Sequence, residues 1–89
     1  MVQNAANKGK ESEDKDEELS EEQVQELVEL QASTFLNMAV THYLLKNFEK
    51  SIDKSTRSLS LKPTIKGFYR RGKGYAELKN YDKACEDLI

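Results

Sequence analysis

The sequence predicts an all-α protein made of consecutive helical hairpins, and three observations support this fold class. The 89 residues are 37% hydrophobic and 34% charged but include only one Pro and four Gly, which is the balance of helical chains. After residue 20, apolar residues recur mostly at steps of three and four. A short segment also returns 33 residues later, and helix–turn–helix units repeat at about this period.

Size and composition exclude several classes of protein. A chain of this length forms one small domain, which rules out an enzyme with separate cofactor and substrate domains. Cys85 is the single cysteine, so neither an internal disulfide nor a cysteine cage for zinc or iron–sulfur is expected. No apolar run approaches the roughly 18–20 residues that span a bilayer, and the first 30 residues lack the apolar stretch of a signal peptide. We therefore expect a cytoplasmic protein, with the nucleus as an alternative, that has no metal or other cofactor.

Charge divides the chain into two parts. Residues 1–22 contain eight acids and three bases, whereas residues 32–89 contain six acids and eleven bases. Residues 8–22 include one apolar side chain in fifteen, too few to offset the entropy lost on ordering. We expect residues 1–19 to be a disordered acidic tail or linker, which is either a spacer or a segment that shields the basic half or docks on a basic partner. Residues 20–89 are expected to be folded.

The first helix is predicted from Ser20 to about Lys46. Ser20 and Gln23 match the capping-box pattern, and acidic residues fill the first turn, where the helix dipole favours them. Asn47 is predicted to end this helix, because Asn tolerates the left-handed conformation. One face of the helix carries residues at helical spacing: Val24, Leu27, Val28, Leu30, Phe35, Met38, Ala39 and His42.

Three further helices follow. The second is predicted over about residues 48–61, because Pro63 disfavours helical backbone in the residue before it. The third covers about residues 65–79, and Asn80 then repeats the break seen at the end of the first helix. A fourth helix is predicted to begin at Tyr81 and to continue to the last residue.

An internal repeat at an offset of 33 residues is the decisive pattern. The string LLKNFEKSI at residues 44–52 returns as ELKNYDKAC at residues 77–85, with Leu, Lys, Asn and a second Lys unchanged. A helix–turn–helix unit of about this length is the period of the tetratricopeptide repeat, in which each unit exposes an apolar face that its neighbour covers. The offset predicts one unit at residues 32–64 and a second, incomplete one at residues 65–89.

The chain resembles the tetratricopeptide-repeat family in more than its period. Residues 32–89, nearly two-thirds of the chain, are similar to the second and third repeats of chaperone-binding domains in FKBP-type and cyclophilin-type immunophilins. The strings FLNMAVTHYLLKNFEKSI and KGFYRRGKGYAELKNYDKACEDL carry this similarity. It implies helical hairpins stacked as a short right-handed α-solenoid. Small residues at the helix crossings, an aromatic residue opening each second helix and a closing proline stand where the family has them: Ala39, Gly72, Ser51, Ala84, Phe48, Tyr81 and Pro63.

The resemblance also implies a binding site for a peptide carboxylate. In the family's carboxylate clamp, the inner helices of three repeats grip the C-terminal carboxylates of heat-shock protein 90 or 70 tails. Asn37 matches the Asn of the second repeat, and Lys66 and Arg70 match the Lys–Arg pair of the third. We assign no residues to the first-repeat positions, because the upstream candidates lie in a polar stretch without a repeat pattern: Asn4, Asn7, Lys8 and Lys10.

Helical spacing supports the same site independently of the resemblance. Lys66, Arg70 and Lys73 are spaced i, i+4 and i+7, so three cations share one stripe of the third helix. Because these like charges repel one another, the stripe is expected to bind an anion rather than to stabilise the helix. An Arg side chain makes a two-pronged contact with a carboxylate, and the Asn37 amide donates a neutral hydrogen bond. The alternative interpretation is an ordinary solvated basic face.

Other candidate sites are weaker. His42 matches Tyr75 in the repeat and is predicted to be a packed histidine, and Cys85 matches Ile52 and is predicted to be a small buried residue. The GKG string in the third helix lacks the preceding strand and the spacing of a phosphate-binding loop. Residues 32–89 are basic, but no recognition motif accompanies the charge. We therefore expect neither a nucleic-acid partner nor a membrane.

The sequence thus predicts a co-chaperone adaptor without catalytic activity, which binds the acidic C-terminal tail of heat-shock protein 90 or 70. One alternative is that the chain is the targeting segment of a peptidyl-prolyl isomerase whose catalytic domain lies elsewhere. Another is a repeat scaffold that binds by its convex surface or edge and ignores free carboxylates. The last unit stops before its repeat closes, so the chain is either a fragment of a longer protein or a short module with half a clamp. The predicted binding residues are Asn37, Lys66, Arg70 and Lys73.

Overall fold

The computed structural model describes residues 18–89, and this part of the chain is all-α, as predicted. The four helices begin where the sequence signals place them, while α1 and α3 each end two residues earlier than expected. Apart from Glu18 and Leu19, which precede α1, the predicted acidic tail at residues 1–19 lies outside the described residues. The helices are α1 (Glu21–Leu44), α2 (Phe48–Leu61), α3 (Ile65–Glu77) and α4 (Tyr81–Leu88).

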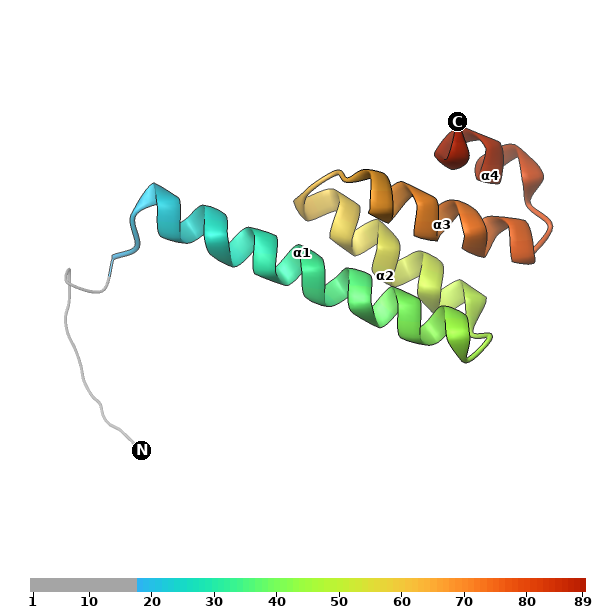
Figure 1. Ribbon diagram of the computed structural model, residues 1–89, viewed down its shortest axis with the longest axis horizontal. Coiled ribbons are helices and arrows are strands. Elements are labelled where there is room, and N and C mark those ends of the chain that lie inside the picture. The colour runs from blue at the N-terminus through green and yellow to red at the C-terminus, as the bar shows by residue number, and fades with distance from the viewer. Residues whose placement is uncertain (1–17) are drawn as a thin grey trace.

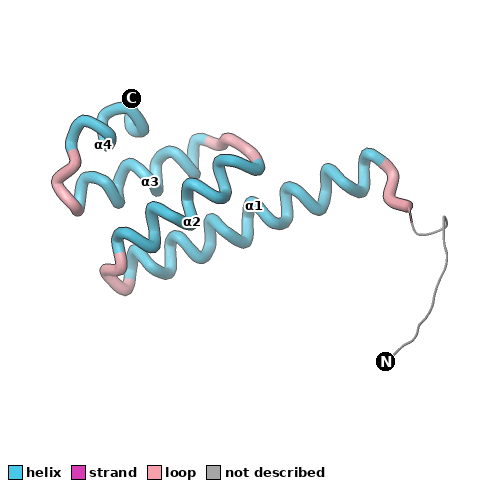
Figure 2. The backbone as a smooth tube through the Cα atoms, turned by 180° about the vertical axis from the view of Figure 1, so that it is seen from behind, coloured by secondary structure: helices cyan, strands magenta, loops and turns pink. Residues whose placement is uncertain are grey.

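The helices pack in chain order as two hairpins (Figure 1). α2 packs against α1, α3 against α2 and α4 against α3, while α3 also touches α1. The view from behind shows the same succession, with the N-terminal half of α1 extending past the end of α2 (Figure 2). None of these helices combines the length and the apolar character needed to cross a membrane. Thus α1 and α3 are in contact, although α2 separates them in the chain.

Small side chains fill the crossing of α1 and α2. Ala32 and Ala39 on α1 face Ser58 and Ser51 on α2, and all four are buried. The Ser51 hydroxyl donates to the carbonyl of Ala39 at 2.8 Å, and the Ser58 hydroxyl donates to that of Ala32 at the same distance. These hydrogen bonds satisfy polar groups that the tight crossing removes from water. The prediction of small residues at this crossing is confirmed.

The second hairpin uses the same crossing positions. Gly72 on α3 and Ala84 on α4 are buried, as their repeat equivalents are in the first hairpin. A Cβ atom on Gly72 would lie 2.6 Å from Cγ of Leu88, so the close approach of α4 requires glycine here. An ion pair also joins the two helices, since Arg71 Nε donates to Asp87 Oδ2 at 2.8 Å and Nη2 donates to Oδ1 at 2.9 Å.

The two hairpin turns have identical geometry. Lys46 and Lys79 adopt the left-handed conformation, with φ values of 65° and 64°. In the first turn, the amides of Lys46 and Asn47 donate to carbonyls of the last turn of α1 at 2.9 and 2.8 Å, and the second turn repeats this Schellman pattern. The prediction that Asn47 and Asn80 take the left-handed position is wrong. The residue before each Asn takes the left-handed conformation instead, and each Asn is the N-cap residue of the following helix.

The link between α2 and α3 sets the direction of α3. Lys62 is extended, with φ −154° and ψ 110°, because Pro63 disfavours a helical conformation there. The Thr64 hydroxyl then accepts a hydrogen bond from the amide of Gly67 at 3.0 Å and caps α3. The chain turns back within three residues, and α3 begins beside α1.

Cys85 differs from the prediction, because it is exposed rather than buried. Its repeat equivalent, Ile52, is covered by α3, where a Cβ atom on Gly74 would lie 2.8 Å from Cγ1 of Ile52. In the part of the chain that the structure describes, no helix lies at the equivalent place over Cys85. Burial at this repeat position therefore depends on a following helix.

Candidate functional site

Three of the predicted binding residues line one cleft between α1 and α3. Asn37 comes from α1, and Lys66 and Arg70 come from α3. The cleft has a volume of about 500 Å³ and is lined by Ser33, Leu36, Asn37, Val40, Lys66, Tyr69 and Arg70. Lys73, the fourth predicted residue, is not among the lining residues. Its Nζ atom lies 6.0 Å from the ring centroid of Tyr69, one turn further along α3.

The two walls of the cleft are built from equivalent repeat positions. Adding 33 to the number of each α1 lining residue gives a residue of α3, and all of these except Lys73 line the opposite wall. Ser33 corresponds to Lys66, Leu36 to Tyr69, Asn37 to Arg70 and Val40 to Lys73. Sequence patterns did not identify Ser33, Leu36, Val40 and Tyr69 as lining residues, although the repeat offset relates Ser33 and Val40 to cations and Leu36 to Tyr69. The cleft is thus neutral on its α1 side and cationic on its α3 side.

The start of α3 adds to the positive character of the cleft. Lys66 lies in the first turn of this helix, and that turn contains no acidic residue. Unpaired backbone amides at a helix N-terminus carry partial positive charge, which favours anions and disfavours a Lys at this place. By contrast, the first turn of α1 contains Glu21 and Glu22. The arrangement at α3 suits a negatively charged ligand better than it suits the stability of the helix.

Arg70 is partly buried between aromatic rings. Its Cζ atom lies 5.5 Å from the ring centroid of Tyr43 and 5.5 Å from that of Tyr69. Within residues 18–89, no carboxylate oxygen lies within 4.0 Å of the charged nitrogens of Lys66, Arg70 or Lys73. The neighbouring Arg71, in contrast, is engaged by Asp87. The guanidinium donors of Arg70 therefore have no acidic partner in the described part of the chain.

A hydrogen bond beside the cations joins α1 to α3. The Tyr43 hydroxyl donates to Oε2 of Glu77 at 3.0 Å. Burial raises the pKa of Tyr43, the hydrogen bond to Glu77 and its charge raise it further, and the positive charges of Lys73 and Arg70 act in the opposite direction. Sequence reasoning missed this pair, because its two members are 34 residues apart and share no motif.

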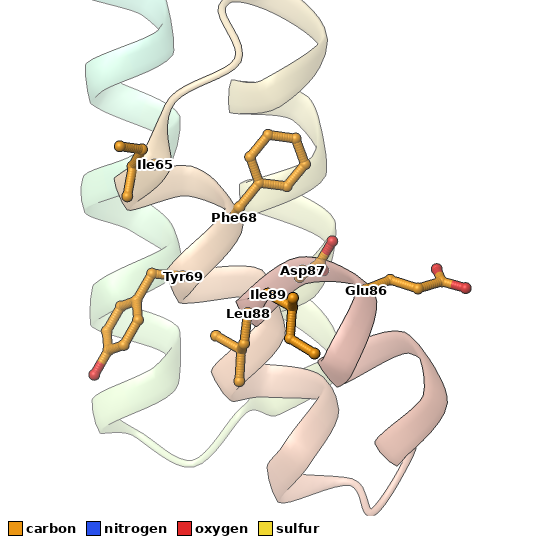
Figure 3. Close-up of a pocket in the computed structure, with 7 residues that line it drawn as sticks. All are labelled: Ile65, Phe68, Tyr69, Glu86, Asp87, Leu88 and Ile89. Carbon is orange, nitrogen blue, oxygen red and sulfur yellow. The ribbon is translucent and has the colours of Figure 1, made fainter.

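A second cleft, of about 430 Å³, lies at the C-terminal end of the described chain (Figure 3). Tyr69 lines this cleft as well, and its ring points away from Phe68. The remaining lining residues come from α3, α4 and the last residue: Ile65, Phe68, Glu86, Asp87, Leu88 and Ile89. Because most of these side chains are apolar, the second cleft offers little to an anion, and Tyr69 forms a wall between two chemically different surfaces.

His42 is half-buried, and its Nδ1 atom is enclosed without a hydrogen-bond partner among the described residues. This environment agrees with the predicted packing role of His42. Across residues 18–89, no three His, Cys, Asp or Glu side chains gather closely enough to hold a metal ion.

Comparison with known proteins identifies distant relatives of this chain. No family model matches the sequence, and no solved structure matches it. A protein of Kluyveromyces lactis named peptidyl-prolyl cis-trans isomerase D is 34% identical over 77 residues, and the alignment covers 81% of this chain and 21% of that protein. The chain thus spans about a fifth of the relative's length and is homologous to one part of it. The alignment also covers more residues than the two predicted units at 32–89.

Proposed function

We propose that this chain is a tetratricopeptide-repeat module of a co-chaperone and that it binds the acidic C-terminal tail of heat-shock protein 90 or 70. Residues 20–89 form the repeat region, with units at 32–64 and 65–89 that belong to a right-handed α-solenoid. The observation that carries the proposal is the cleft between α1 and α3, which is lined by Asn37, Lys66 and Arg70 and has no acidic partner for its cations among residues 18–89.

Each of the three residues has a distinct role in this proposal. Arg70 makes a two-pronged contact with a carboxylate, and Lys66 supplies a point charge at the positive end of α3. Asn37 donates a neutral hydrogen bond from the opposite wall. Each charged contact contributes about 1.5–3 kcal/mol, so the two cations together contribute about 3–6 kcal/mol to the binding of a short peptide. Lys73 lies outside the cleft and adds longer-range attraction that salt screens.

A second proposal concerns the protein to which this module belongs. The similarity to a peptidyl-prolyl isomerase supports a parent isomerase that this segment delivers to a chaperone. The chain itself then catalyses no reaction. Recovering the full coding sequence and assaying prolyl isomerisation by the full-length protein and by the 89-residue chain tests this proposal. Activity only in the full-length protein is expected, and a full-length protein without activity contradicts it.

Titration with a carboxylate-terminated peptide tests the binding function. The ligand is a peptide that ends in Glu-Glu-Val-Asp, compared with the same peptide carrying a C-terminal amide, and affinity is measured by calorimetry. We expect the amidated peptide to bind more weakly. Arg70→Ala is expected to raise the Kd about tenfold or more, because it removes a charge-assisted contact. Lys50→Ala is the matched control, since Lys50 is an exposed cation on α2 outside the cleft.

Two outcomes contradict the clamp. Equal affinities for the free and amidated peptides show that the carboxylate is not recognised and favour a scaffold that binds through another surface. An equal loss of affinity in Arg70→Ala and Lys50→Ala shows general charge attraction rather than a site. Circular dichroism of each variant confirms that its helices are intact. A chain extended upstream to include a first repeat must also bind, because the clamp would then be complete.

A further inference from the structure

Two tyrosines contact the cations beside the cleft. The ring of Tyr69 lies against both Arg70 and Lys73, with the charged groups 5.5 and 6.0 Å from its centroid, and the ring of Tyr43 lies 5.5 Å from Arg70. A cation at this distance is attracted to the negative face of an aromatic ring. Tyr69 is 48% exposed, so its ring contributes less to the core than a buried aromatic residue does. The contacts thus restrict where the two cations can lie.

The Tyr43 hydroxyl donates a hydrogen bond to Glu77, a carboxylate on the same helix as the cations. Glu77 follows Lys73 by four residues, a spacing at which a helix readily forms an ion pair. Among the described residues, however, Glu77 forms no ion pair with Lys73 and accepts a hydrogen bond from Tyr43 at 3.0 Å. The Tyr43 ring is itself held edge-on by Phe48, at a centroid distance of 5.4 Å and an angle of 66°. The hydroxyl therefore sits at a defined place between α1 and α3.

We infer that Tyr43 and Tyr69 are positioning residues that keep the cations of the cleft available to an acidic peptide end. The Tyr69 ring holds Arg70 and Lys73 at the α3 wall, and the Tyr43 hydroxyl keeps the Glu77 carboxylate from neutralising Lys73. This inference rests on the proposed function, because the ligand is the same carboxylate-terminated peptide. Neither tyrosine has to touch the peptide for this role.

The first experiment changes only the ring of Tyr69. Tyr69→Ala is expected to raise the Kd of the carboxylate-terminated peptide about fivefold, and Tyr69→Phe, which keeps the aromatic face, is expected to stay within about twofold of the unchanged chain. The ring-current shift of the Arg70 side-chain Nε–H proton, measured by NMR without peptide, should decrease in Tyr69→Ala, where only the Tyr43 ring remains beside Arg70, and should persist in Tyr69→Phe. An unchanged Arg70 proton shift together with an unchanged Kd in Tyr69→Ala overturns the role of Tyr69.

The two proposals fail in different ways in this experiment. If the unaltered chain does not bind the peptide, the proposed function fails, while the peptide-free NMR measurement still decides whether Tyr69 holds Arg70. If the unaltered chain binds and the Arg70 signal is insensitive to Tyr69, the positioning role fails and the function stands. Helical content and melting temperature of the variants exclude unfolding as a cause.

A double-mutant cycle tests Tyr43. Tyr43→Phe removes the hydroxyl and retains the ring that packs on Phe48. It is expected to raise the Kd about two- to threefold, because the released Glu77 then pairs with a cation of the stripe. In a chain that already carries Glu77→Gln, the same Tyr43→Phe change should leave the Kd unaltered. An equal loss in both backgrounds overturns the inference, since the hydroxyl would then act without Glu77.

Discussion

The α1–α2 and α3–α4 hairpins place small residues at equivalent repeat positions, yet different interactions hold each pair of helices together. In the first hairpin, Ser51 and Ser58 donate to backbone carbonyls of α1. In the second, Ala84 replaces Ser51, and the Arg71–Asp87 ion pair joins α3 to α4. The first hairpin is thus joined by neutral hydrogen bonds at two places along the helix crossing, whereas the second is joined by one ion pair.

The neighbouring residues Arg70 and Arg71 differ in whether an acidic side chain pairs with them. α4 has only eight residues, and an isolated helix of this length is marginal in water. Arg71 supplies a strong, two-pronged contact that holds it, with the Asp87 side chain only 6% exposed. Arg70 faces the cleft and has no carboxylate partner within residues 18–89. Arg71 therefore stabilises the second hairpin, whereas Arg70 is a candidate for binding an anion.

Among the predicted changes, the removal of Arg71 is expected to lower the stability of the fold most. Arg71→Ala leaves the Asp87 carboxylate nearly enclosed without its partner, and we expect the free energy of unfolding to fall by about 3 kcal/mol. Urea unfolding followed by circular dichroism measures the loss, and amide hydrogen exchange shows whether α4 opens first.

The matched control for Arg71 is an exposed ion pair on α2. Arg57 Nε lies 3.3 Å from Asp53, and both side chains are more than half exposed. Arg57→Ala is expected to cost less than about 1 kcal/mol, since exposed pairs contribute little. If the Arg71 and Arg57 variants lose equal stability, the Arg71–Asp87 pair does not hold the second hairpin.

A smaller effect is expected from removing a hydroxyl in the first hairpin. Ser51→Ala deletes the hydrogen bond to Ala39 but leaves that carbonyl in its helix, so we expect a loss of about 1 kcal/mol. Ser60→Ala is the control, because the Ser60 hydroxyl bonds to Arg57 in an exposed position. Thermal unfolding of both variants gives the difference. A Ser51 variant as stable as the Ser60 variant would mean that close packing alone holds α1 against α2.

Much of this structure was predictable from local signals. Helix starts follow from the Ser20 capping box, from Pro63 and from the 33-residue offset, and the same offset brings Asn37 and Arg70 to opposite walls of one cleft. These features depend on residues close in sequence or on the repeat. The exposure of Cys85 was not predictable, because it depends on whether a following helix covers this position.

The interactions across the helices were also beyond local signals. Tyr43 meets Glu77, and Arg71 meets Asp87, only after the helices have packed at particular angles. Composition and periodicity place such residues on faces but do not pair them. The end of α1 was also mispredicted. Asn tolerates the left-handed conformation well, but Lys46 adopts it, and the amides of Lys46 and Asn47 then bond to the last carbonyls of α1. Sequence patterns therefore predict which face of a helix a residue lies on, but not which residue of another helix it contacts.

The smallest expected effect concerns the exposed ion pair of the first hairpin and its pH dependence. The hydrogen bond from Lys62, at 2.7 Å, and a weaker one from Gln25 hold the pKa of Glu29 below its ordinary value of 4.5. A carboxyl group with a depressed pKa stabilises the fold above its unfolded-state pKa, and this contribution disappears as the pH falls through the folded-state pKa. Both side chains are nearly half exposed, so the effect is small and weakens in salt.

Glu29→Gln should therefore lower the melting temperature slightly at neutral pH and leave it unchanged once the pH is well below 4.5. Over the range from neutral pH down through the folded-state pKa of Glu29, which lies below 4.5, the difference between the two chains should shrink as the unaltered Glu29 becomes protonated. Ser51→Ala, in contrast, should lower the melting temperature equally across this range, because a hydroxyl bonded to a carbonyl does not titrate. A Glu29→Gln difference that stays constant with pH would show that the charge of the carboxylate does not help to hold the end of α2 to α1.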